Sequence, residues 1–586
     1  MEAAEGRLVL GVNLSHDMAC AAVRDGRVEV AVAEERLNRV KYCTGLTAYG
    51  RIVPWRSIRY CCRELDRDPR EVDLFVVNSC RSNARRQLQE QLVGIDPARV
   101  VDLGHPGHHL AHAHSAFDCS PFESAAVLVL DTNGGFVEER GRLLRKEHYA
   151  CYAGSPGGLR EAFKDWVLPG EVSVGELYCL YSAALQLTPQ PNGAYGRDCA
   201  LSAGGKLMGL AAWDRERRAL PALLRVEERR LSIRLAAVLE RLRELGRVNG
   251  ERTAAVDELF GFQLRHHVAL ERRRDSLRRP EHLRLAGEAQ RLLEEAVLAL
   301  ARRAHRETGL TDLCLAGGSF LNVVASTRIL EETPFRRVFV QPAAGDAGNA
   351  IGAAMWGYRQ LGGRRRPYLE LPYSSYLGRT YSAADVRGVV EGRLAGLGLQ
   401  LQELPDEAER ARALAERLAR GQVLAVCRGR SEFGPRALGH RSFLAAPWPA
   451  RMRERLNQIK GREWYRPVAP VLPREELARF FEAAWDESPF MTLAARARAE
   501  TREQAPAVCH VDGSARPQTV TAQQEPFVHR LLLAFGAASG VPMLVNTSLN
   551  LRGQPLVETP DEAAAVFLAD ERVDALLLGD LLVSRR

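Results

Sequence analysis

Five histidines lie within ten positions of one short segment, residues 105–117, which reads HPGHHLAHAHSAF. His108 and His112 are four residues apart, so on a helix they face the same side. Pro106 suits the first turn of such a helix. Imidazole nitrogens one helical turn apart are typical ligands of a divalent metal ion. The spacing predicts that these two side chains bind one metal ion together.

Two aspartates in glycine-rich surroundings complete the candidate set of ligands. Residues 125–135 read AAVLVLDTNGG, an apolar strand that ends in an aspartate, and residues 342–354 place a second aspartate in PAAGDAGNAIGAA. Two imidazoles and two carboxylates admit iron, manganese or zinc. We therefore predict a metal site made of His108, His112, Asp131 and Asp346.

Histidines on helices also occur as packed core residues or on solvated faces, without any ligand. This is the default interpretation for His105, His109 and His114, which point elsewhere around the same helix. Any one of them is a candidate contact to a substrate or to a metal ligand.

A second group of candidate residues lies in the last third of the chain. Its arginines are separated by glycine and proline, so they do not form an amphipathic face, and they suit bidentate contacts to phosphate or carboxylate groups. Strand-end side chains add amide and hydroxyl donors. Because arginine is common here, the alternative is that several form surface ion pairs. The candidates are Arg430, Arg436, Arg441, Lys460, Arg462, Arg466, Arg516, Asn546 and Ser548.

Lysine is rare in this chain and is therefore more informative than arginine. Only five of the 81 basic residues are lysine. Lys41, Lys206 and Lys460 lie in the motif-like segments NRVKY, GGKLMGL and NQIKGREWYRP. A lysine kept where the chain otherwise uses arginine indicates that a compact ammonium group is needed.

Length and composition restrict the class of protein. A chain of 586 residues with 46% apolar and 26% charged residues is an ordinary globular protein of two or three domains. We find no apolar run near the ~20 residues of a membrane helix and no signal peptide. Cysteines without a CxxC pair favour a reducing, cytoplasmic location. The net charge of +8, without an arginine-aromatic tract, makes nucleic acid an improbable partner.

The elements predicted from the sequence indicate an α/β fold. An opening hairpin turns at Asp25-Gly26, and later strands run into glycine-rich turns, a pattern typical of actin-like ATPase folds. The expected strands are residues 8–15, 19–24, 28–33, 72–78, 125–130, 313–316, 337–340 and 423–427, and the expected helices include 348–361 and 408–420. We expect a first domain over residues 1–361, mostly helical between 216 and 306, a linker at 362–380 and a second domain over 381–586.

Beyond these separate features, the chain resembles the ATP-dependent O-carbamoyltransferases of the NodU, CmcH and TobZ type. The matching motifs follow the family's order along nearly the whole chain, with the weakest coverage at residues 216–279. They are LGVNLSHDMACAAV, AEERLNRVK, HHLAHAHSAF, VLVLDTNGG, GGKLMGLA, LAGGSFLN, GDAGNAIGAA, GRSEFGPRALGHRS, IKGREWYRPVAP, DGSARPQTV and LVNTSLNLRGQPLVETP.

The resemblance implies two catalytic units. The first is similar to the actin-like domain that transfers a carbamoyl group from an adenylate in tRNA threonylcarbamoyladenosine synthesis. The second is similar to the YrdC domain, which makes such adenylates. ATP and carbamoyl phosphate would give carbamoyl-adenylate, and transfer to an alcohol would leave an O-carbamate, AMP, pyrophosphate and phosphate. Divalent metal, iron(II) in this family, with Mg²⁺ for ATP, completes the implied cofactors.

The resemblance also implies roles for individual residues. The family's catalytic residues match His16 and Lys41, and its metal ligands match the four predicted above. Gly134, Gly317, Gly318 and Asn322 would approach the nucleotide or carbamoyl-adenylate in the first domain. The ATP and carbamoyl phosphate site of the second domain would include Arg436, Arg441, Lys460, Arg466, Arg516, Asn546 and Ser548. The chain departs from the family at Leu549, where Phe is common, and at His440, where Asn is common.

The leading hypothesis is carbamoylation of a small-molecule hydroxyl, in an antibiotic or other secondary metabolite. The alternatives are carbamoylation of a nodulation-type oligosaccharide or of tRNA, and an actin-like regulatory ATPase without transfer chemistry. The histidine pair and the arginine cluster count against the regulator, since such an ATPase needs neither. Pyrophosphate release from ATP and carbamoyl phosphate discriminates the transferases from a regulator that makes only ADP.

Overall fold

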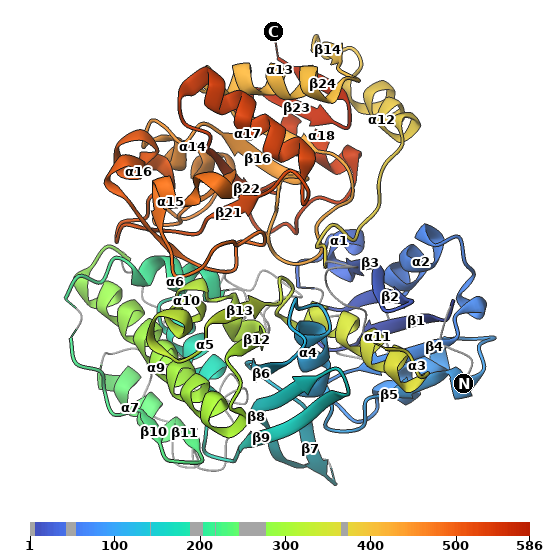
Figure 1. Cartoon of the computed structure of the whole chain (residues 1–586), viewed down its shortest axis with the longest axis vertical. Coiled ribbons are helices and arrows are strands. Elements are labelled where there is room, and N and C mark those ends of the chain that lie inside the picture. Colours follow the sequence, from blue (N-terminus) through green and yellow to red (C-terminus); the bar gives the residue numbers. More distant parts are fainter. Residues whose placement is uncertain are drawn as a thin grey trace. The chain divides into compact units, whose positions relative to one another are not determined.

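The structure is a computed structural model that describes residues 6–42, 54–140, 142–187, 203–216, 218–244, 277–364 and 373–585. The chain divides into two compact units (Figure 1). The first contains residues 1–34 and 42–373, and the second contains residues 35–41 and 374–586. Both units mix helices and sheets, as the predicted α/β class requires. The division after Tyr373 falls inside the predicted linker, of which residues 365–372 lie outside the described part. Residues 35–41 group with the second unit, whereas the sequence placed them in the first domain.

The first unit opens with a five-stranded sheet in the order β3-β2-β1-β4-β5. Strands β1 to β3 are antiparallel, and β1, β4 and β5 are parallel. The predicted hairpin is present, and Asp25 and Gly26 both have positive φ, as a tight two-residue turn requires. The strands are β1 (Leu8–Asn13), β2 (Ala19–Arg24), β3 (Arg27–Ala33), β4 (Leu74–Asn78) and β5 (Val100–Asp102).

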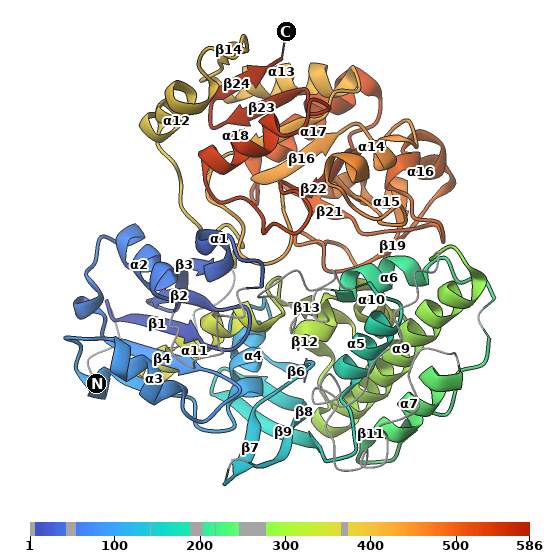
Figure 2. The same cartoon turned by 180° about the vertical axis from the view of Figure 1, so that it is seen from behind.

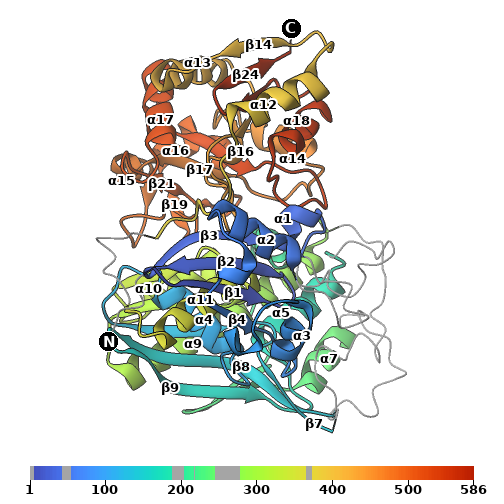
Figure 3. The same ribbon diagram turned by 90° about the vertical axis from the view of Figure 1, so that its right-hand side faces the viewer.

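A six-stranded sheet forms the other half of the first unit, in the order β13-β12-β6-β8-β7 with β9 paired to β8. Strands β6, β12 and β13 are parallel, and β8 and β9 form a long antiparallel hairpin (Figure 3). Burial on both faces explains the apolar sequence of β6. The strands are β6 (Ala125–Leu130), β7 (Phe136–Glu139), β8 (Arg142–Ser155), β9 (Gly158–Val167), β12 (Asp312–Ala316) and β13 (Arg337–Val340).

Two buried helices join these sheets, α4 (His108–Phe117) and α11 (Asn349–Gln360). Helix α11 packs on α4, β1, β2 and β4, and α4 packs on β6, β8 and β12. The approach is very close, because a Cβ atom at Gly352 would lie 1.8 Å from the carbonyl oxygen of Ala111. One at Gly11 would lie 1.9 Å from that of Ala350. Glycine at these positions lets α4 and α11 carry the candidate site into the core.

The remaining helices of the first unit gather mainly beside the second sheet. Figure 2 shows α5 (Val174–Ala184), α6 (Gly204–Ala211), α9 (Pro280–Thr308) and α10 (Val323–Glu332) together, and all three others contact α9. The predicted helical stretch contains α7 (Leu235–Glu244) but also the hairpin β10 (Leu224–Val226) and β11 (Leu231–Ile233). Burial alternates along β11, which is the period of a strand rather than of a helix. Residues 245–276 lie outside the described part. Helices α2 (Trp55–Glu64) and α3 (Ala84–Gln91) flank the first sheet.

The second unit contains an eight-stranded mixed sheet in the order β14-β24-β23-β15-β16-β22-β17-β21. Alternate residues of its strands enter two cores, one beneath α13 (Glu407–Ala419) and α17 (Pro526–Ser539), the other beneath α14 (Met452–Ile459) and α18 (Pro560–Leu568). The strands are β14 (Gln400–Glu403), β15 (Leu424–Cys427), β16 (Arg441–Ala445), β17 (Ala469–Pro473), β21 (Gln518–Val520), β22 (Leu544–Ser548), β23 (Ala575–Leu578) and β24 (Leu581–Ser584).

Smaller elements complete the described chain. They are α1 (Glu34–Asn38), α12 (Ala383–Val389), α15 (Leu477–Phe480), α16 (Ala499–Gln504) and a three-stranded sheet of β18 (Phe481–Glu482), β19 (Ala495–Ala497) and β20 (Ser514–Ala515). Across the described residues, no helix combines the length and the hydropathy that a membrane crossing needs.

Candidate functional site

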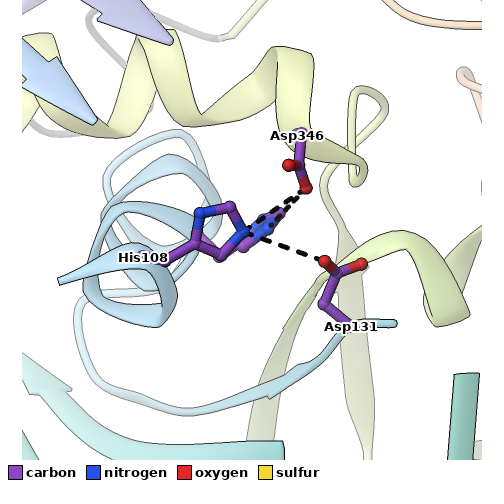
Figure 4. Close-up of side chains that lie close together, drawn as sticks. His108, Asp131 and Asp346 are labelled. Atoms are coloured by element: carbon purple, nitrogen blue, oxygen red, sulfur yellow. Dashed lines mark ion pairs between the residues drawn. The ribbon is translucent and has the colours of Figure 1, made fainter. Parts of the chain in front are cut away.

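The structure brings the four predicted metal ligands together. His108 and His112 lie on α4, one helical turn apart. Asp131 directly follows β6, and Asp346 begins the short turn before α11; the side chains of both aspartates point towards that of His108 (Figure 4). One donor atom from each residue lies within 4.8 Å of the other three, and all four residues are buried. Donors from segments more than 200 residues apart in sequence therefore meet at one point in the core.

Several polar atoms of this cluster have no hydrogen-bond partner among the described residues. The Nε2 atoms of His108 and His112 lie 3.4 Å and 3.5 Å from Asp346 Oδ1, and His108 Nε2 lies 3.8 Å from Asp131 Oδ2. Oδ1 of Asp346, Oδ2 of Asp131 and both ring nitrogens of His112 are buried without a hydrogen bond among the described residues. Two buried carboxylates and two imidazoles around one point fit a divalent cation, which would satisfy these atoms.

Backbone geometry around β12 holds Asp131 in place. The N–H of Gly318 donates to Asp131 Oδ1 at 2.7 Å. Gly317 has φ +99°, and a Cβ atom there would lie 2.2 Å from the carbonyl oxygen of Leu130. Only glycine lets the two strand ends approach so closely. The structure thus shows both glycines positioning a ligand, and their contact with a nucleotide stays a prediction.

Polar residues at two strand ends surround His108, and the sequence analysis missed them. The Nδ1 atom of His108 lies 3.4 Å from Asn78 Nδ2 and 3.6 Å from Cys80 Sγ. Asn78 in turn donates to Asn13 Oδ1 at 3.1 Å. Such partners orient a ligating histidine and fix its tautomer. The available signal was an asparagine ending each of the buried strands β1 and β4.

His16 lies directly beside the cluster. Its Nδ1 is 2.8 Å from Asp346 Oδ2, which also accepts a 2.5 Å hydrogen bond from Ser15 Oγ. Desolvation opposes protonation, but the charge of Asp346 outweighs it and raises the pKa of His16 well above its ordinary value. The side chain is 24% exposed, whereas that of Asp346 is fully buried. His16 therefore links a buried ligand to the accessible side of the site.

Lys41, the other predicted catalytic residue, groups with the second unit. The pKa of Lys460 is lowered there by burial, by the charge of Arg462 and then by the charge of Lys41. The next residue, Tyr42, belongs to the first unit and accepts a 3.0 Å hydrogen bond from the backbone N–H of Asp17. Within the first unit, the residue that follows Lys41 is thus bonded to the His16 loop.

The other histidines of the segment have separate environments. His114 Nδ1 lies 2.8 Å from Asp118, which also pairs with Arg359, so His114 belongs to a structural ion pair. His105 bonds the carbonyl of Phe136. His109 is fully buried, and neither of its ring nitrogens has a hydrogen bond within the described part of the chain. Burial, followed by the charges of the neighbouring histidines, lowers the pKa of His109 well below the ordinary value. Contrary to expectation, α4 begins at His108, after Pro106.

Two residues predicted to approach a nucleotide have internal contacts instead. Asn322 caps α10 by accepting a hydrogen bond from Ala325 N at its Oδ1. Its Oδ1 also accepts from Gln290 Nε2, and its Nδ2 donates to Gln290 Oε1. Its donors and acceptor are thus largely used within the protein. A Cβ atom at Gly134 would lie 2.4 Å from Glu147 Cβ and 2.7 Å from His109 Nε2, so glycine is required there by packing. Nucleotide contacts of both residues stay predictions.

In the second unit, Lys460 follows α14 and reaches the end of β22. Its ammonium donates to the side chain and backbone of Ser548 and to Asn550 Oδ1 at 2.8 Å. It is 3% exposed, and its acceptors are neutral oxygens. Desolvation first, then the charges of Arg462, Lys41 and Arg466, lowers the pKa of Lys460 well below its ordinary value.

Several half-buried guanidinium groups surround this lysine. Desolvation and the charges of Arg436, Arg466 and Arg462 lower the pKa of Arg516 well below its ordinary value. Desolvation and Arg466 likewise lower the pKa of Arg462 to about 9. Glu463 lies 3.6 Å from Arg466, and Arg516 Nε is buried and has no hydrogen bond to any residue that the structure describes. This excess of converging positive charge is what a polyanion site requires.

Arg441 and Asn546 differ from the prediction. The guanidinium of Arg441 is fully buried and donates to the carbonyls of Arg428, Gly429, His440 and Glu558. Because its donors are used on the backbone, Arg441 supports the loop instead of facing an anion. The Asn546 amide nitrogen donates to Ala437 O at 3.1 Å and Gln518 Oε1 at 2.8 Å, inside the sheet. We leave both residues out of the proposed anion site.

His440, which departs from the family pattern, is also structural. Its Nδ1 lies 2.6 Å from the carbonyl oxygen of Arg430, and its Nε2 lies 2.9 Å from Glu525 Oε2. Glu525 also pairs with Arg428 at 2.6 Å. The ring stacks on Tyr376 with centroids 4.0 Å apart. Similarly, Arg430 donates to the carbonyls of Leu377 and Gly378.

Comparisons with known proteins identify the class to which these sites belong. Residues 95–355 match the family model "Carbamoyltransferase N-terminus", and residues 415–585 match "Carbamoyltransferase C-terminus". The chain belongs to the carbamoyltransferase family and is a transferase.

Individual relatives agree with this assignment. Nodulation protein NolNO of Sinorhizobium fredii is 32% identical over 99% of this chain and 81% of its own length. Nodulation protein U of Rhizobium tropici is 28% identical over 95% of this chain and 93% of its own. The 3'-hydroxymethylcephem-O-carbamoyltransferase of Streptomyces clavuligerus is 38% identical over 45% of this chain and 47% of its own.

Proposed function

We propose that this transferase is an ATP-dependent O-carbamoyltransferase that makes carbamoyl-adenylate and transfers its carbamoyl group to a hydroxyl of a small molecule. The observation that carries the proposal is a pair of sites of opposite charge, one in each unit. The first unit presents four buried metal-type donors, and the second presents converging cations. An adenylating step needs polyphosphate binding, and a transfer step needs stabilisation of the departing AMP.

We assign the adenylating step to the second unit. Water and carbamoyl phosphate give carbamate and phosphate, and the carbamate oxygen attacks the α-phosphorus of Mg-ATP and displaces pyrophosphate. Arg436, Arg462, Arg466 and Arg516 would hold the phosphate groups, because guanidinium groups make bidentate bonds to phosphate oxygens. Lys460, bound to Ser548, would act as a buried point charge at the same site.

We assign the transfer step to the first unit. His108, His112, Asp131 and Asp346 would hold a divalent metal, iron(II) by resemblance, which supplies Lewis-acid stabilisation of charge on the leaving phosphate. The substrate hydroxyl attacks the carbamoyl carbon, and AMP leaves. His16 would polarise the carbamoyl carbonyl through its Nε2–H, because its Nδ1 is directed to Asp346 and the charge of that carboxylate raises the pKa of the imidazole. The hydroxyl proton would pass to the leaving phosphate. Lys41 would contribute a positive charge near the carbamoyl oxygen or the phosphate.

Finer structural assignments belong to the same proposal. The antiparallel hairpin followed by parallel strands in the first sheet supports an actin-like first domain. A YrdC-like second domain fits a unit with its own sheet and its own cationic site. We propose a cytoplasmic location, where ATP and carbamoyl phosphate are available.

Product analysis tests the function directly. The protein is incubated with ATP, carbamoyl phosphate, Mg²⁺ and Fe²⁺, with and without a panel of hydroxylated acceptors that includes a 3'-hydroxymethylcephem and a chito-oligosaccharide. Pyrophosphate release that requires carbamoyl phosphate, together with the mass gain of one carbamoyl group on an acceptor, supports the proposal. Release of ADP and phosphate, without pyrophosphate, would instead indicate a regulatory ATPase and reject it.

A further inference from the structure

Strand β8 carries three consecutive buried ionisable residues that the proposed mechanism does not use. Lys146, Glu147 and His148 are 0%, 0% and 2% exposed. Successive strand residues normally point to opposite faces. Here the pairing of β8 with β9 shifts register between Glu147 and Tyr149, and this bulge changes the direction of the chain at the triplet. Three polar residues are thereby kept inside the unit.

All three residues bond to the loop after Asp131 or to the helix beside it. The Lys146 ammonium donates to Asn133 Oδ1 at 2.9 Å. Glu147 Oε2 accepts from Gly135 N at 2.8 Å, and its backbone pairs with Gly134 and Gly135. His148 Nε2 accepts from Val174 N at 3.2 Å, in the first turn of α5. The loop of residues 132–135 is thus held by side-chain and backbone groups of β8.

The first turn of α5 fixes the same loop from a second direction. Ser173 Oγ donates to the carbonyl of Thr132 at 2.7 Å. Glu176 caps this turn by accepting from Ser173 N, and its other oxygen bonds the Lys146 ammonium. Side-chain exposures of 0% and 5% exclude solvent from this ion pair. Lys146 therefore connects the cap of α5 to Asn133.

We propose that Lys146 and Glu176 form a positioning pair that fixes Asn133 and the 132–135 loop, and thereby sets the carboxylate of Asp131 at the metal site. Asp131 immediately precedes the loop, so a displaced loop changes the geometry of a ligand. A buried ion pair is weak evidence for stability alone, because desolvation offsets its attraction. Its bonds to a loop beside a ligand give it a positional role.

The identity of the cation supports this inference. Two of the five lysines in an arginine-rich chain lie here, Lys146 on Asn133 and Lys164 at 3.0 Å from Glu147 Oε1. Lys146 is completely enclosed, so the larger, planar guanidinium of arginine would not fit the same contacts. The inference rests on the proposed metal site, since it concerns how that site is held.

Metal titration of the full-length protein tests the pair. In Lys146→Met we expect affinity for Fe²⁺, and for Zn²⁺ as a redox-inert probe, to fall about 10- to 100-fold. Pyrophosphate release in the second unit should stay at the wild-type rate. The matched control is Arg291→Met, which breaks a partly buried ion pair with Asp214 in the same unit and should leave metal affinity unchanged.

Asn133→Ala separates positioning from general destabilisation, because it removes the acceptor without leaving a charge unpaired. We expect it to reproduce most of the loss in metal affinity, and the double variant to be no worse than Lys146→Met alone. Wild-type affinity in both single variants would overturn the inference. If the losses of metal affinity add in the double variant, Lys146 does not act through Asn133, and that part of the inference would be overturned. If the unaltered protein binds no metal, the proposed metal site itself fails, which is a different result.

Discussion

The two candidate sites of this molecule contrast in the charged groups that their own residues bring together. In the first unit, two buried aspartates face two histidines, and several of the donor atoms lack hydrogen bonds among the described residues. In the second unit, a buried lysine and several arginines converge, and burial, followed by their mutual repulsion, lowers the pKa values of Lys460, Arg462 and Arg516. Each group is unfavourable in isolation and becomes favourable with a ligand of opposite charge.

This contrast teaches that unbalanced charge can indicate the kind of ligand. Paired ions in the same molecule look different, for example Arg359 on Asp118 or Arg428 on Glu525, where the partner is part of the protein. The construction also differs. The first site uses side chains on a buried helix and at strand ends, whereas the second uses loops after α14 and between strands. The first is suited to fixed coordination, and the second to a larger and more variable anion.

His112→Ala should have the largest effect on this contrast. It removes one of four metal donors, and we expect carbamoyl transfer to fall at least about 10³-fold, since a bound metal contributes several kcal/mol of charge stabilisation. Pyrophosphate release with ATP and carbamoyl phosphate should persist. The two rates are measured on the same preparation. His105→Ala, on the same segment but exposed, is the matched control. Loss of both activities would argue against separate sites.

Arg516→Met should impair the second unit and leave the first unchanged. A charge-assisted bidentate contact to phosphate contributes up to about 3 kcal/mol, so pyrophosphate release should fall about 100-fold. Metal binding by the first unit should be unchanged, as shown by titration. Arg516→Lys keeps the charge without the planar fork and should recover only part of the rate. A wild-type rate in Arg516→Met would remove this residue from the anion site.

The sequence was most informative where ligand spacing and strand ends coincide. A separation of four residues in the segment after Pro106, and aspartates at glycine-rich turns, were enough to predict that His108, His112, Asp131 and Asp346 meet. The opening hairpin was equally local, because its turn residues need positive φ. These features depend on short-range geometry, which a sequence pattern reports directly.

Other features depended on contacts that no local pattern contains. The sequence of a motif does not show whether the guanidinium of an arginine faces a ligand or donates to the backbone. The guanidinium of Arg441 donates to four backbone carbonyls. Asn322 could not be distinguished as a helix cap bound to Gln290, because Gln290 lies 32 residues away. Lys146 was visible as a rare lysine, but its role required the α5 cap and the bulge in β8.

Glu525→Gln tests a carboxylate of the second unit that is bonded to His440 and Arg428. Burial opposes ionisation of Glu525, but its bonds to His440 and Arg428 lower its pKa to about 2, below the ordinary value of 4.5. This carboxylate therefore stabilises the folded state above about pH 4.5, and the contribution is lost as the pH falls towards 2. We expect Glu525→Gln to be less stable by about 2 kcal/mol at pH 7.

Urea unfolding between pH 7 and pH 3 measures the difference. The difference in unfolding free energy between variant and wild type should narrow as the medium becomes acidic, because Glu525 of the unfolded wild type then takes up a proton, which favours unfolding. The control is Glu407→Gln, whose pair with Arg530 is more exposed, at 35% and 48% of the two side chains, and is worth less than about 1 kcal/mol. A constant gap across this pH range would contradict the assignment of the pairing to Glu525.

The smallest predicted effect concerns the converging cations of the second unit and has the opposite sign. In the ligand-free protein, Arg516→Met removes a half-buried charge that Arg436, Arg462 and Arg466 repel. We expect the second unit to become more stable by about 1 kcal/mol, with a melting temperature about 2 to 4 °C higher. Pyrophosphate should raise the melting temperature of the wild type more than that of the variant, because only the wild type has the complete site. Arg530→Met should change neither value. A destabilised ligand-free variant would mean that Arg516 holds the fold together, and that positive charge at this site is balanced from within the protein.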